Sequence, residues 1–200
     1  QTKGIVPKMK NANELVFANT KVNLALHVVG KRSDGYHFLD SLVIFPKIKD
    51  KLVIKEANNF SLTIGGEFSE FIDPNKNSVI KAFNLVKNQL PSNFSIHLEK
   101  NIPVGAGLGG GSANSAAVLR YFQNNYKIQI PKNEIIAQVG ADVPVCLSDK
   151  FQRVRGIGEI TEEISETDFK LWIVLVNPRI NVSTEKIFQS LRERENKELE

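Results

Sequence analysis

The segment of residues 103–113, which reads PVGAGLGGGSA, constrains the fold of this 200-residue chain more than any other. Glycine has no Cβ, so successive backbone N–H groups of such a loop can turn toward one anion. Small residues that favour a helix follow from Ser112, and a helix that begins there adds unpaired N–H donors and the positive end of its dipole. The sequence therefore predicts a phosphate-binding loop that opens a helix, with a nucleotide as its ligand.

Other glycine-rich loops fit this segment less well. A P-loop places Lys directly before Ser or Thr, and Gly111 occupies that place here. The spacing of Gly105, Gly107 and Gly110 matches a dinucleotide-binding loop, but such a loop follows a buried strand directly. Polar residues separate it here from the nearest expected strand, at 94–98. A flexible loop without a ligand remains an alternative.

The whole run resembles the signature of the GHMP kinases, the superfamily of galactokinase, homoserine kinase and mevalonate kinase. Residues 21–26 (KVNLAL) and 30–37 (GKRSDGYH) are similar to the opening of one of its families, the 4-diphosphocytidyl-2-C-methyl-D-erythritol kinases. Residues 140–144 (GADVP) resemble the catalytic segment of the same family. The segments occur in the family's order, and the resemblance runs from about residue 17 to about residue 188.

The resemblance implies an α+β, two-lobed GHMP kinase fold whose N-terminal lobe is similar to the second domain of ribosomal protein S5. Residues 1–150 then form the N-terminal domain that binds ATP and substrate, and residues 151–200 begin a C-terminal domain that is truncated. Such enzymes continue to a second glycine-rich segment, and this chain has no glycine after Gly158. A compositional shift at 150–155 supports the division, and the end of the chain, 192–200, is expected to be a solvated run of charges.

The activity implied by the resemblance is ATP-dependent phosphorylation of the 2-hydroxyl of 4-diphosphocytidyl-2-C-methyl-D-erythritol, a step of the methylerythritol phosphate route to isoprenoid precursors, with Mg²⁺ helping to neutralise the triphosphate. Asp142 would be the general base, and Lys21 would lie beside it and hold it ionised. Without the family, Asp142 could equally cap a helix that begins at Val143-Pro144. Lys21 could be a solvated lysine on a strand edge.

The resemblance also assigns the two ligand sites. Tyr36 and His37 would recognise the cytosine of the substrate, which would lie between Tyr36 and Phe188, and Asn23 and Thr184 would make polar contacts to the substrate. Turn aromatics and a surface histidine are the alternatives for these residues. The expected ATP-binding residues are Pro103, Val104, Gly105, Ala106, Gly107, Leu108, Gly109, Gly110, Gly111, Ser112 and Ala113.

Composition excludes several classes of protein. A single Cys rules out an intramolecular disulfide framework and suits a reducing compartment, and Cys146 is expected to be a buried structural residue. His27 and His97 lack partners at metal-ligand spacing. No apolar stretch approaches a membrane span, and residues 1–13 lack a signal-peptide core, which predicts a cytosolic protein. The net charge of +4 suits anionic ligands, but scattered lysines argue against nucleic acid as a partner.

Hydrophobic periodicity predicts alternating strands and helices. In the strand at 22–29, Val22, Leu24, Leu26 and Val28 share one face, so Lys21 and Asn23 lie together on the other. The predicted strands are 14–18, 22–29, 39–45, 51–56, 61–64, 94–98 and 171–176. The predicted helices are 78–90, 112–124, 132–139 and 184–198.

Two further functions remain open. A GHMP kinase could phosphorylate another small alcohol such as homoserine or mevalonate, although these acceptors have no base to stack on an aromatic ring. A nucleotide-binding module without catalysis is the alternative from a different class. The sequence predicts neither the oligomeric state nor the metal ligands.

Overall fold

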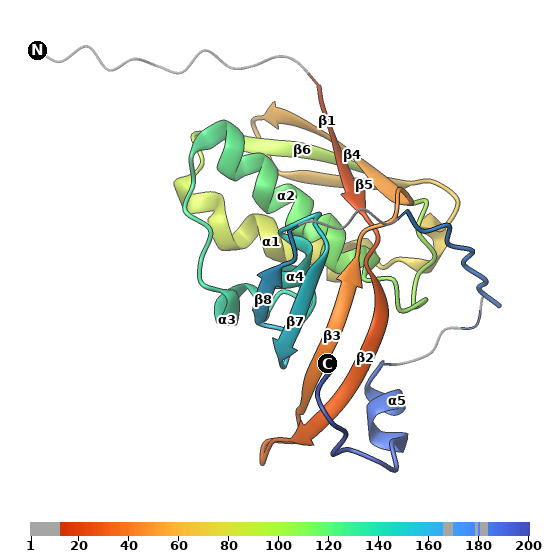
Figure 1. Cartoon of the computed structure of the whole chain (residues 1–200). Helices are drawn as coiled ribbons and strands as arrows, with labels where there is room; N and C mark the ends of the chain where they lie inside the picture. Colours follow the sequence, from red (N-terminus) through yellow and green to blue (C-terminus); the bar gives the residue numbers. More distant parts are fainter. Residues whose placement is uncertain (1–12, 166–169, 179, 181–183) are drawn as a thin grey trace, which may run out of the picture.

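The computed structural model describes residues 13–165, 170–178, 180 and 184–200 of the chain (Figure 1). Residues 1–12, for which the sequence predicts no signal-peptide core, lie outside this range. Strands and helices alternate along the described chain, as the sequence predicts. The strands belong to two separate sheets.

The first sheet has the strand order β1-β4-β6-β5 (Figure 1). Its strands are β1 (Glu14–Asn19), β4 (Lys49–Ala57), β6 (Asn93–Glu99) and β5 (Ser61–Gly65). β4 pairs antiparallel with β1 and with β6, and β5 pairs parallel with β6. A parallel pair requires a crossover, and the crossover here carries helix α1 (Ser78–Val86) and three single turns of 3₁₀-helix. These turns are η1 (Ser69–Phe71), η2 (Pro74–Lys76) and η3 (Lys87–Gln89).

Helices α1 and α2 (Gly110–Tyr126) cover one face of this sheet, and the main core lies between them and the strands (Figure 1). Apolar residues of β4 and β6 meet Ala116 and Ala117 of α2 in this core, and all are buried. The small side chains let α2 approach the sheet closely, because an alanine adds little bulk between backbone and sheet. The prediction of a helix that follows the glycine loop is therefore confirmed.

The second sheet has the order β2-β3-β7-β8 and is antiparallel throughout. Its strands are β2 (Val22–Lys31), β3 (His37–Ile44), β7 (Gln152–Gly156) and β8 (Ile160–Glu163). Three short helices complete the described chain: α3 (Asn133–Ile136), α4 (Val143–Cys146) and α5 (Thr184–Ser190). Because β7 and β8 join the sheet that contains β3, the division at residue 150 stays a prediction.

The chain passes from the first sheet to the second at a buried corner. Thr20 and Lys21 connect β1 to β2, and both are buried. The backbone N–H of Thr20 donates to the carbonyl of Ile48 at 2.9 Å, and that of Lys21 donates to the carbonyl of Leu108 at 3.1 Å. The second bond ties the start of β2 to the glycine loop, so Lys21 is held where the two sheets and the loop meet.

The strands predicted before residue 100 are present, each within about two residues of its expected ends. The helix predicted at 78–90 is present as α1 continued by η3, and the helix predicted at 112–124 is α2. Burial along the apolar face of β2 is less regular than the alternation predicts, because β2 bulges between Asn23 and Ala25. This face carries Val22, Leu24, Leu26 and Val28. Leu24 and Leu26 are consequently about two-fifths exposed.

Several predictions for the second half of the chain are wrong. Residues 171–176 form no strand, and a strand-like sequence without a partner strand cannot complete its backbone hydrogen bonds. The helices predicted at 132–139 and 184–198 are shorter, spanning only α3 and α5. The charged side chains of the run 192–200 are mostly exposed, as predicted, but Asn196 and Leu199 also form hydrogen bonds with the second sheet. β7 and β8 have no counterpart among the predicted elements, whereas α4 begins at Val143, where the sequence offered a helix start as an alternative.

Candidate active site

The glycine loop has the backbone conformation that its composition predicts. Gly105, Gly107 and Gly109 have φ angles of 68°, 72° and 64°, which L side chains rarely adopt. Gly109 is the N-cap of α2, so the first N–H groups of this 17-residue helix open onto the loop. The geometry provides the anion-binding helix terminus that the sequence predicts.

A buried carboxylate holds the two ends of this loop. Asp50 of β4 is fully buried and pairs with the ammonium group of Lys100. Its Oδ1 accepts hydrogen bonds from the backbone N–H groups of Asn101 and Ile102, both at 2.7 Å, and its Oδ2 accepts one from Asn114 Nδ2 at 2.9 Å. Asp50 thereby joins the residues directly before the loop to the helix directly after it.

Lys100 is buried as deeply as its partner. Burial lowers the pKa of Lys100, and the charge of Asp50 opposes that effect. A Cβ added at Gly110 would lie 2.8 Å from Lys100 Nζ, so glycine is needed for the loop to pass over the ammonium group. Sequence reasoning missed Asp50, Lys100 and Asn114, because a buried polar residue within a strand or helix pattern is not distinguished from an exposed one.

A cavity of about 690 Å³ lies over the glycine loop. The loop forms one wall, and Asn77 and Ser78 at the start of α1 line the same region. Residues from the segment 71–76, together with Lys100 and Asn114, also line it. Side chains from distant parts of the chain contribute as well: Lys21, Asn23, Leu26, Leu39, Asp142, Ile187 and Phe188. Loop, polar residues and aromatic ring therefore share one cavity, which gives room for two ligands side by side.

Lys21 and Asp142 form an ion pair in this cavity, with Lys21 Nζ 3.1 Å from Asp142 Oδ1. The Lys21 side chain is 9% exposed and that of Asp142 is 39% exposed. Asp142 stands at the N-cap of α4, but its side chain makes no capping hydrogen bond. Both plain alternatives are therefore wrong: Lys21 is not a solvated edge lysine, and Asp142 directs its carboxylate to Lys21 instead of capping the helix.

Asn23 lies beside this pair. Lys21 Nζ donates to Asn23 Oδ1 at 3.2 Å, and Ser41 Oγ lies at the same distance from that oxygen. Ser41 is buried on β3 and its hydroxyl also lies 2.7 Å from the carbonyl oxygen of Ala25, at the bulge of β2. Because an ammonium group only donates, it fixes Asn23 with the amide oxygen toward Lys21.

At the far end of the cavity, the ring of Phe188 from α5 stacks on His37, with centroids 5.2 Å apart. His37 Nε2 is buried and has no hydrogen-bond partner among the described residues, and burial lowers the pKa of His37. Tyr36 is 58% exposed in the preceding turn, and neither Tyr36 nor His37 is among the residues that line the cavity. Thr184 begins α5, but its side chain lies outside the described atoms. A base between Tyr36 and Phe188 stays a prediction.

The remaining candidate residues are structural. Cys146 is buried in α4, and burial raises the pKa of its thiol to about 12, which suits a core residue and not a nucleophile. His27 Nδ1 bonds to the carbonyl of Lys197 at 2.7 Å, and His97 Nδ1 bonds to Thr63 Oγ1 at 2.9 Å. Within the described ranges, no group of three or more His, Cys, Asp or Glu side chains could hold a metal ion.

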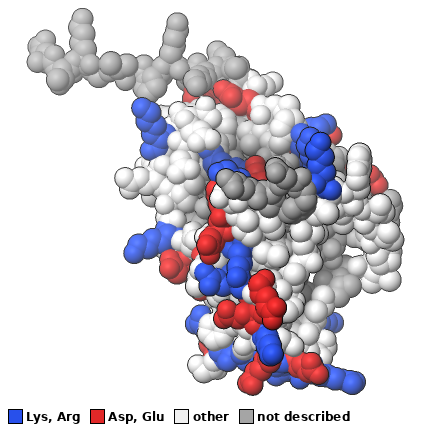
Figure 2. Space-filling model, in the orientation of Figure 1, with Lys and Arg blue, Asp and Glu red and all other residues white. Residues whose placement is uncertain are grey.

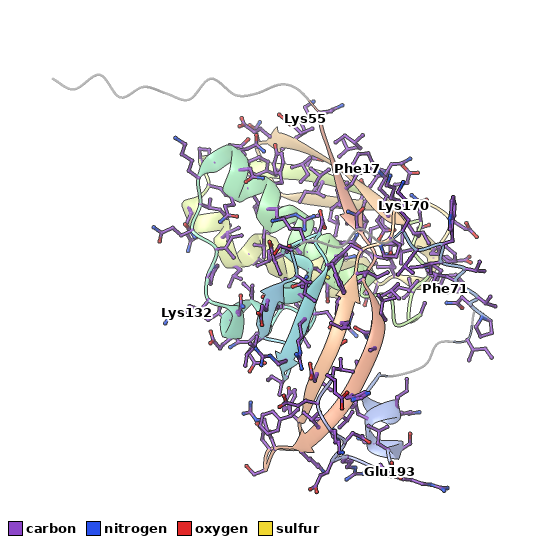
Figure 3. All side chains as sticks on the ribbon, viewed as in Figure 1. Phe17, Lys55, Phe71, Lys132, Lys170 and Glu193 are labelled. Carbon is purple, nitrogen blue, oxygen red and sulfur yellow. The ribbon has the colours of Figure 1, made fainter. Side chains whose placement is uncertain are left out.

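Charged side chains of both signs are interspersed on the face shown in Figure 2, and they gather toward its lower part. Figure 3 shows Phe71 projecting beside the glycine-loop end of the molecule and Glu193 at the opposite end, beyond α5. None of the helices that the structure describes is long and apolar enough to cross a membrane.

Comparison with known proteins agrees with this geometry. The family model "GHMP kinases N terminal domain" matches residues 77–150, which contain the glycine loop and Asp142. The 4-diphosphocytidyl-2-C-methyl-D-erythritol kinase of Cereibacter sphaeroides is 39% identical over 181 residues, which cover 90% of this chain and 64% of that protein. The protein of the same name from Agrobacterium fabrum is 39% identical over 205 residues, covering 96% of this chain and 68% of its own length.

The chain thus spans about two thirds of the length of the curated relatives it matches. A crystal structure of 4-(cytidine 5'-diphospho)-2C-methyl-D-erythritol kinase superposes with a TM-score of 0.61 at 33% identity, over 76% of this chain and 55% of that one. Mevalonate pyrophosphate decarboxylase from Streptococcus pyogenes superposes with a TM-score of 0.57 at 11% identity, over 82% and 54% of the two chains, and so shares the fold. Taken with the match to the GHMP model, the similarity over most of the Agrobacterium protein shows that this chain belongs to the 4-diphosphocytidyl-2-C-methyl-D-erythritol kinase family of GHMP kinases.

Proposed function

We propose that the whole protein transfers the γ-phosphoryl group of ATP to the 2-hydroxyl of 4-diphosphocytidyl-2-C-methyl-D-erythritol. The observation that carries the proposal is the Lys21–Asp142 pair, 3.1 Å apart in the cavity that the glycine loop lines. A carboxylate and a cation beside a phosphate-binding loop are the groups that phosphoryl transfer to an alcohol requires.

In this reaction the acceptor oxygen forms a bond to the γ-phosphorus while the bond from that phosphorus to the β–γ bridging oxygen breaks, and ADP leaves. Asp142 accepts the proton of the attacking hydroxyl, as a general base. Lys21 orients the Asp142 carboxylate through their ion pair and neutralises charge that develops on the transferred group. The loop from Pro103 to Ala113 holds the nucleotide phosphates through its N–H groups and the N-terminus of α2.

Mg²⁺ accompanies ATP in this proposal and supplies further positive charge to the triphosphate. Two carboxylates, Asp73 and Asp142, line the cavity among the described residues, and no cluster of three acidic or imidazole side chains does. This lining fits Mg²⁺, which is held mostly by substrate phosphates and water with one or two carboxylates.

The acceptor end is proposed to bind the cytidyl group through Tyr36, His37 and Phe188, with Asn23 and Thr184 as polar contacts. The unpartnered buried Nε2 of His37 supports this assignment, because a buried polar atom gains most from a ligand that satisfies it. Phe188 lines the cavity and stacks on His37, so an aromatic surface is present for a base. The cytosolic location and the domain division at residue 150 are proposed on the sequence alone.

The direct test measures ADP release by the purified full-length protein with Mg-ATP and 4-diphosphocytidyl-2-C-methyl-D-erythritol. Homoserine and mevalonate serve as comparison acceptors. We expect release that depends on the cytidyl acceptor alone. Release with homoserine or mevalonate instead would assign a different acceptor to the same fold, and binding of ATP analogues without release for any acceptor would leave a binding module.

Replacing Tyr36 with Ala is expected to raise the KM for the cytidyl acceptor by roughly tenfold or more, because stacking of a base on an aromatic ring is worth about 1–3 kcal/mol. The KM for ATP should stay within about twofold of the original value. Steady-state kinetics with each substrate varied in turn make the comparison. An effect confined to ATP would remove Tyr36 from the acceptor site.

Replacing Gly109 with Ala tests whether the loop positions Lys21. The new Cβ would lie 2.8 Å from Lys21 Cγ, at a φ of +64° that disfavours alanine. We expect a fall in kcat of roughly tenfold or more, since displacing a catalytic cation costs transition-state stabilisation.

Gly107→Ala is the matched control for Gly109→Ala. Its φ of +72° imposes similar backbone strain, but its Cβ would meet nothing within 4 Å. Gly107→Ala has the strain without the contact with Lys21, so it should lower kcat less than Gly109→Ala does. Equal losses in the two variants would show that contact with Lys21 is not the cause.

A further inference from the structure

Outside the catalytic cavity, a second buried carboxylate joins three parts of the chain. Asp40 of β3 is fully buried, and its two oxygens accept from Arg153 of β7, with Arg153 Nε to Oδ1 at 2.8 Å and the terminal nitrogen to Oδ2 at 2.6 Å. This bidentate bond holds the pKa of Asp40 below its usual range. Oδ2 also accepts from the backbone N–H of Leu199 at 2.8 Å, and Arg153 donates to the carbonyl of Leu199 at 2.8 Å. Both members of the pair therefore bind the backbone of Leu199, near the end of the described chain.

Residues 194–199, here called the strap, lie along the second sheet (Figure 1). The backbone N–H and the Nδ2 of Asn196 both donate to the carbonyl of Val28 at 3.0 Å. His27 Nδ1 donates to the carbonyl of Lys197 at 2.7 Å, since a carbonyl can only accept. The strap is thus bonded to β2 at its middle and to the Asp40–Arg153 pair at its end.

The strap is continuous with the helix that carries Phe188. The backbone N–H of Leu191 bonds to the carbonyl of Phe188 at 3.4 Å, and Arg194 Nε bonds to the carbonyl of Leu191 at 3.1 Å. Arg194 also lies close enough to His37 for its charge to help lower the pKa of that ring. Helix α5 has only seven residues, and a helix of that length does not hold a conformation by itself. The position of α5 over His37 therefore depends on the hydrogen bonds of the strap that follows it.

We propose that the Asp40–Arg153 pair is a positioning element for the acceptor site: by holding the strap on the second sheet, it keeps Phe188, which lines the cavity, stacked on His37. The proposal rests on the proposed function for the identity of the acceptor. Neither Asp40 nor Arg153 lines the cavity, so any effect on substrate acts through the strap. The glycine loop and the Lys21–Asp142 pair have separate hydrogen bonds, so ATP binding should not depend on the strap.

The test replaces Arg153 with Met in the full-length protein and measures the KM for each substrate. We expect the KM for the cytidyl acceptor to rise about tenfold, with the KM for ATP within about twofold and kcat changed less than the acceptor KM. Arg153→Lys restores the charge without the bidentate geometry and should give an intermediate acceptor KM. Lys150→Met is the control, because Lys150 lies just before β7, pairs with exposed Glu163 at 2.7 Å and does not line the cavity. That variant should leave both KM values unchanged.

Leu199→Pro removes one of the two bonds between the strap and the buried pair, and the bond from Arg153 to the Leu199 carbonyl remains. The substitution removes the N–H that donates to Asp40 and leaves the Asp40–Arg153 bonds in place. It should raise the acceptor KM as Arg153→Met does, with an unchanged melting temperature. It should also speed hydrogen exchange in residues 184–199, a readout that does not need catalysis.

The outcomes separate this proposal from the proposed function. Failure of the unaltered protein to release ADP with any acceptor would contradict the proposed function. Faster hydrogen exchange in residues 184–199 on loss of Arg153 would still support the positioning role of the buried pair. An equal rise in the two KM values in Leu199→Pro, or unchanged exchange and acceptor KM in that variant, would overturn the positioning role.

Discussion

Asp142→Asn is expected to leave nucleotide binding intact and to lower kcat by about three orders of magnitude. The amide keeps the size of the side chain and its place at the start of α4, but it cannot accept the proton of the attacking hydroxyl. A general base contributes about 10²–10⁴ in rate, and loss of the charge also leaves Lys21 without its partner 3.1 Å away. The measurement is single-turnover phosphoryl transfer, together with calorimetric binding of an ATP analogue.

Asp149→Asn provides the matched control for this substitution. Asp149 lies seven positions further along and pairs with Arg120 at 3.2 Å, with a side chain that is 43% exposed. It lies outside the residues that line the cavity, so its loss should leave kcat within about twofold. Retention of a near-normal rate by Asp142→Asn would remove Asp142 as the base, and an equal loss in both variants would point to a structural effect.

The parts of this site that could be predicted from the sequence are those with a local signature. The glycine run required positive φ angles, and Gly105, Gly107 and Gly109 have them. Alternation along β2 placed Lys21 beside Asn23, and the two side chains are bonded. In these cases the same few residues determine both the pattern and the geometry.

The meeting of Lys21 with Asp142 required knowledge of the tertiary fold. About 120 positions separate them, and the buried corner at Thr20 together with the bond from Lys21 to Leu108 brings them into one cavity. The local sequence was also compatible with two roles for Asp142, a general base or a helix N-cap, since Asp before Val-Pro is a common helix start. The structure places it at the cap position and directs its carboxylate elsewhere, a choice that depends on Lys21.

The errors in the second half of the chain have a common physical origin. Residues 171–176 have the apolar β-branched sequence of a strand, yet no described strand pairs with them. By contrast, β7 carries Arg153 and Arg155 in a short polar sequence, and it forms because β3 offers it an edge. The pairing partner decides whether a short segment becomes a strand, and the partner is not encoded within the segment.

The two buried carboxylates of the described chain illustrate the same limit for polar residues. Asp40 and Asp50 each sit in a strand, where an acidic residue is normally taken for a solvent-facing position. Each is fully buried because its donors arrive from other elements: Arg153 from β7 in one case, Lys100 and Asn114 in the other. One pair supports the acceptor side of the cavity and the other supports the glycine loop.

Asp50→Ala is expected to lower the free energy of unfolding by about 3–5 kcal/mol, because removal of one partner leaves a buried, uncompensated charge on Lys100. The backbone N–H groups of Asn101 and Ile102 lose their acceptor as well. Since these residues lead directly into the glycine loop, the affinity for ATP should fall in the same variant. Urea denaturation followed by circular dichroism measures the stability, and calorimetry measures the nucleotide affinity.

Two further variants identify the buried charge as the cause. Glu99→Ala removes the ion pair of Glu99 with Lys51, which joins β6 to β4 at the neighbouring position but is exposed on both sides. Water compensates such a pair, so the denaturation midpoint should not change. Adding Lys100→Met to Asp50→Ala removes the stranded ammonium group, and we expect the double variant to be more stable than Asp50→Ala alone. If the double variant is no more stable, the loss comes from the unsatisfied N–H groups of the loop and not from the charge of Lys100.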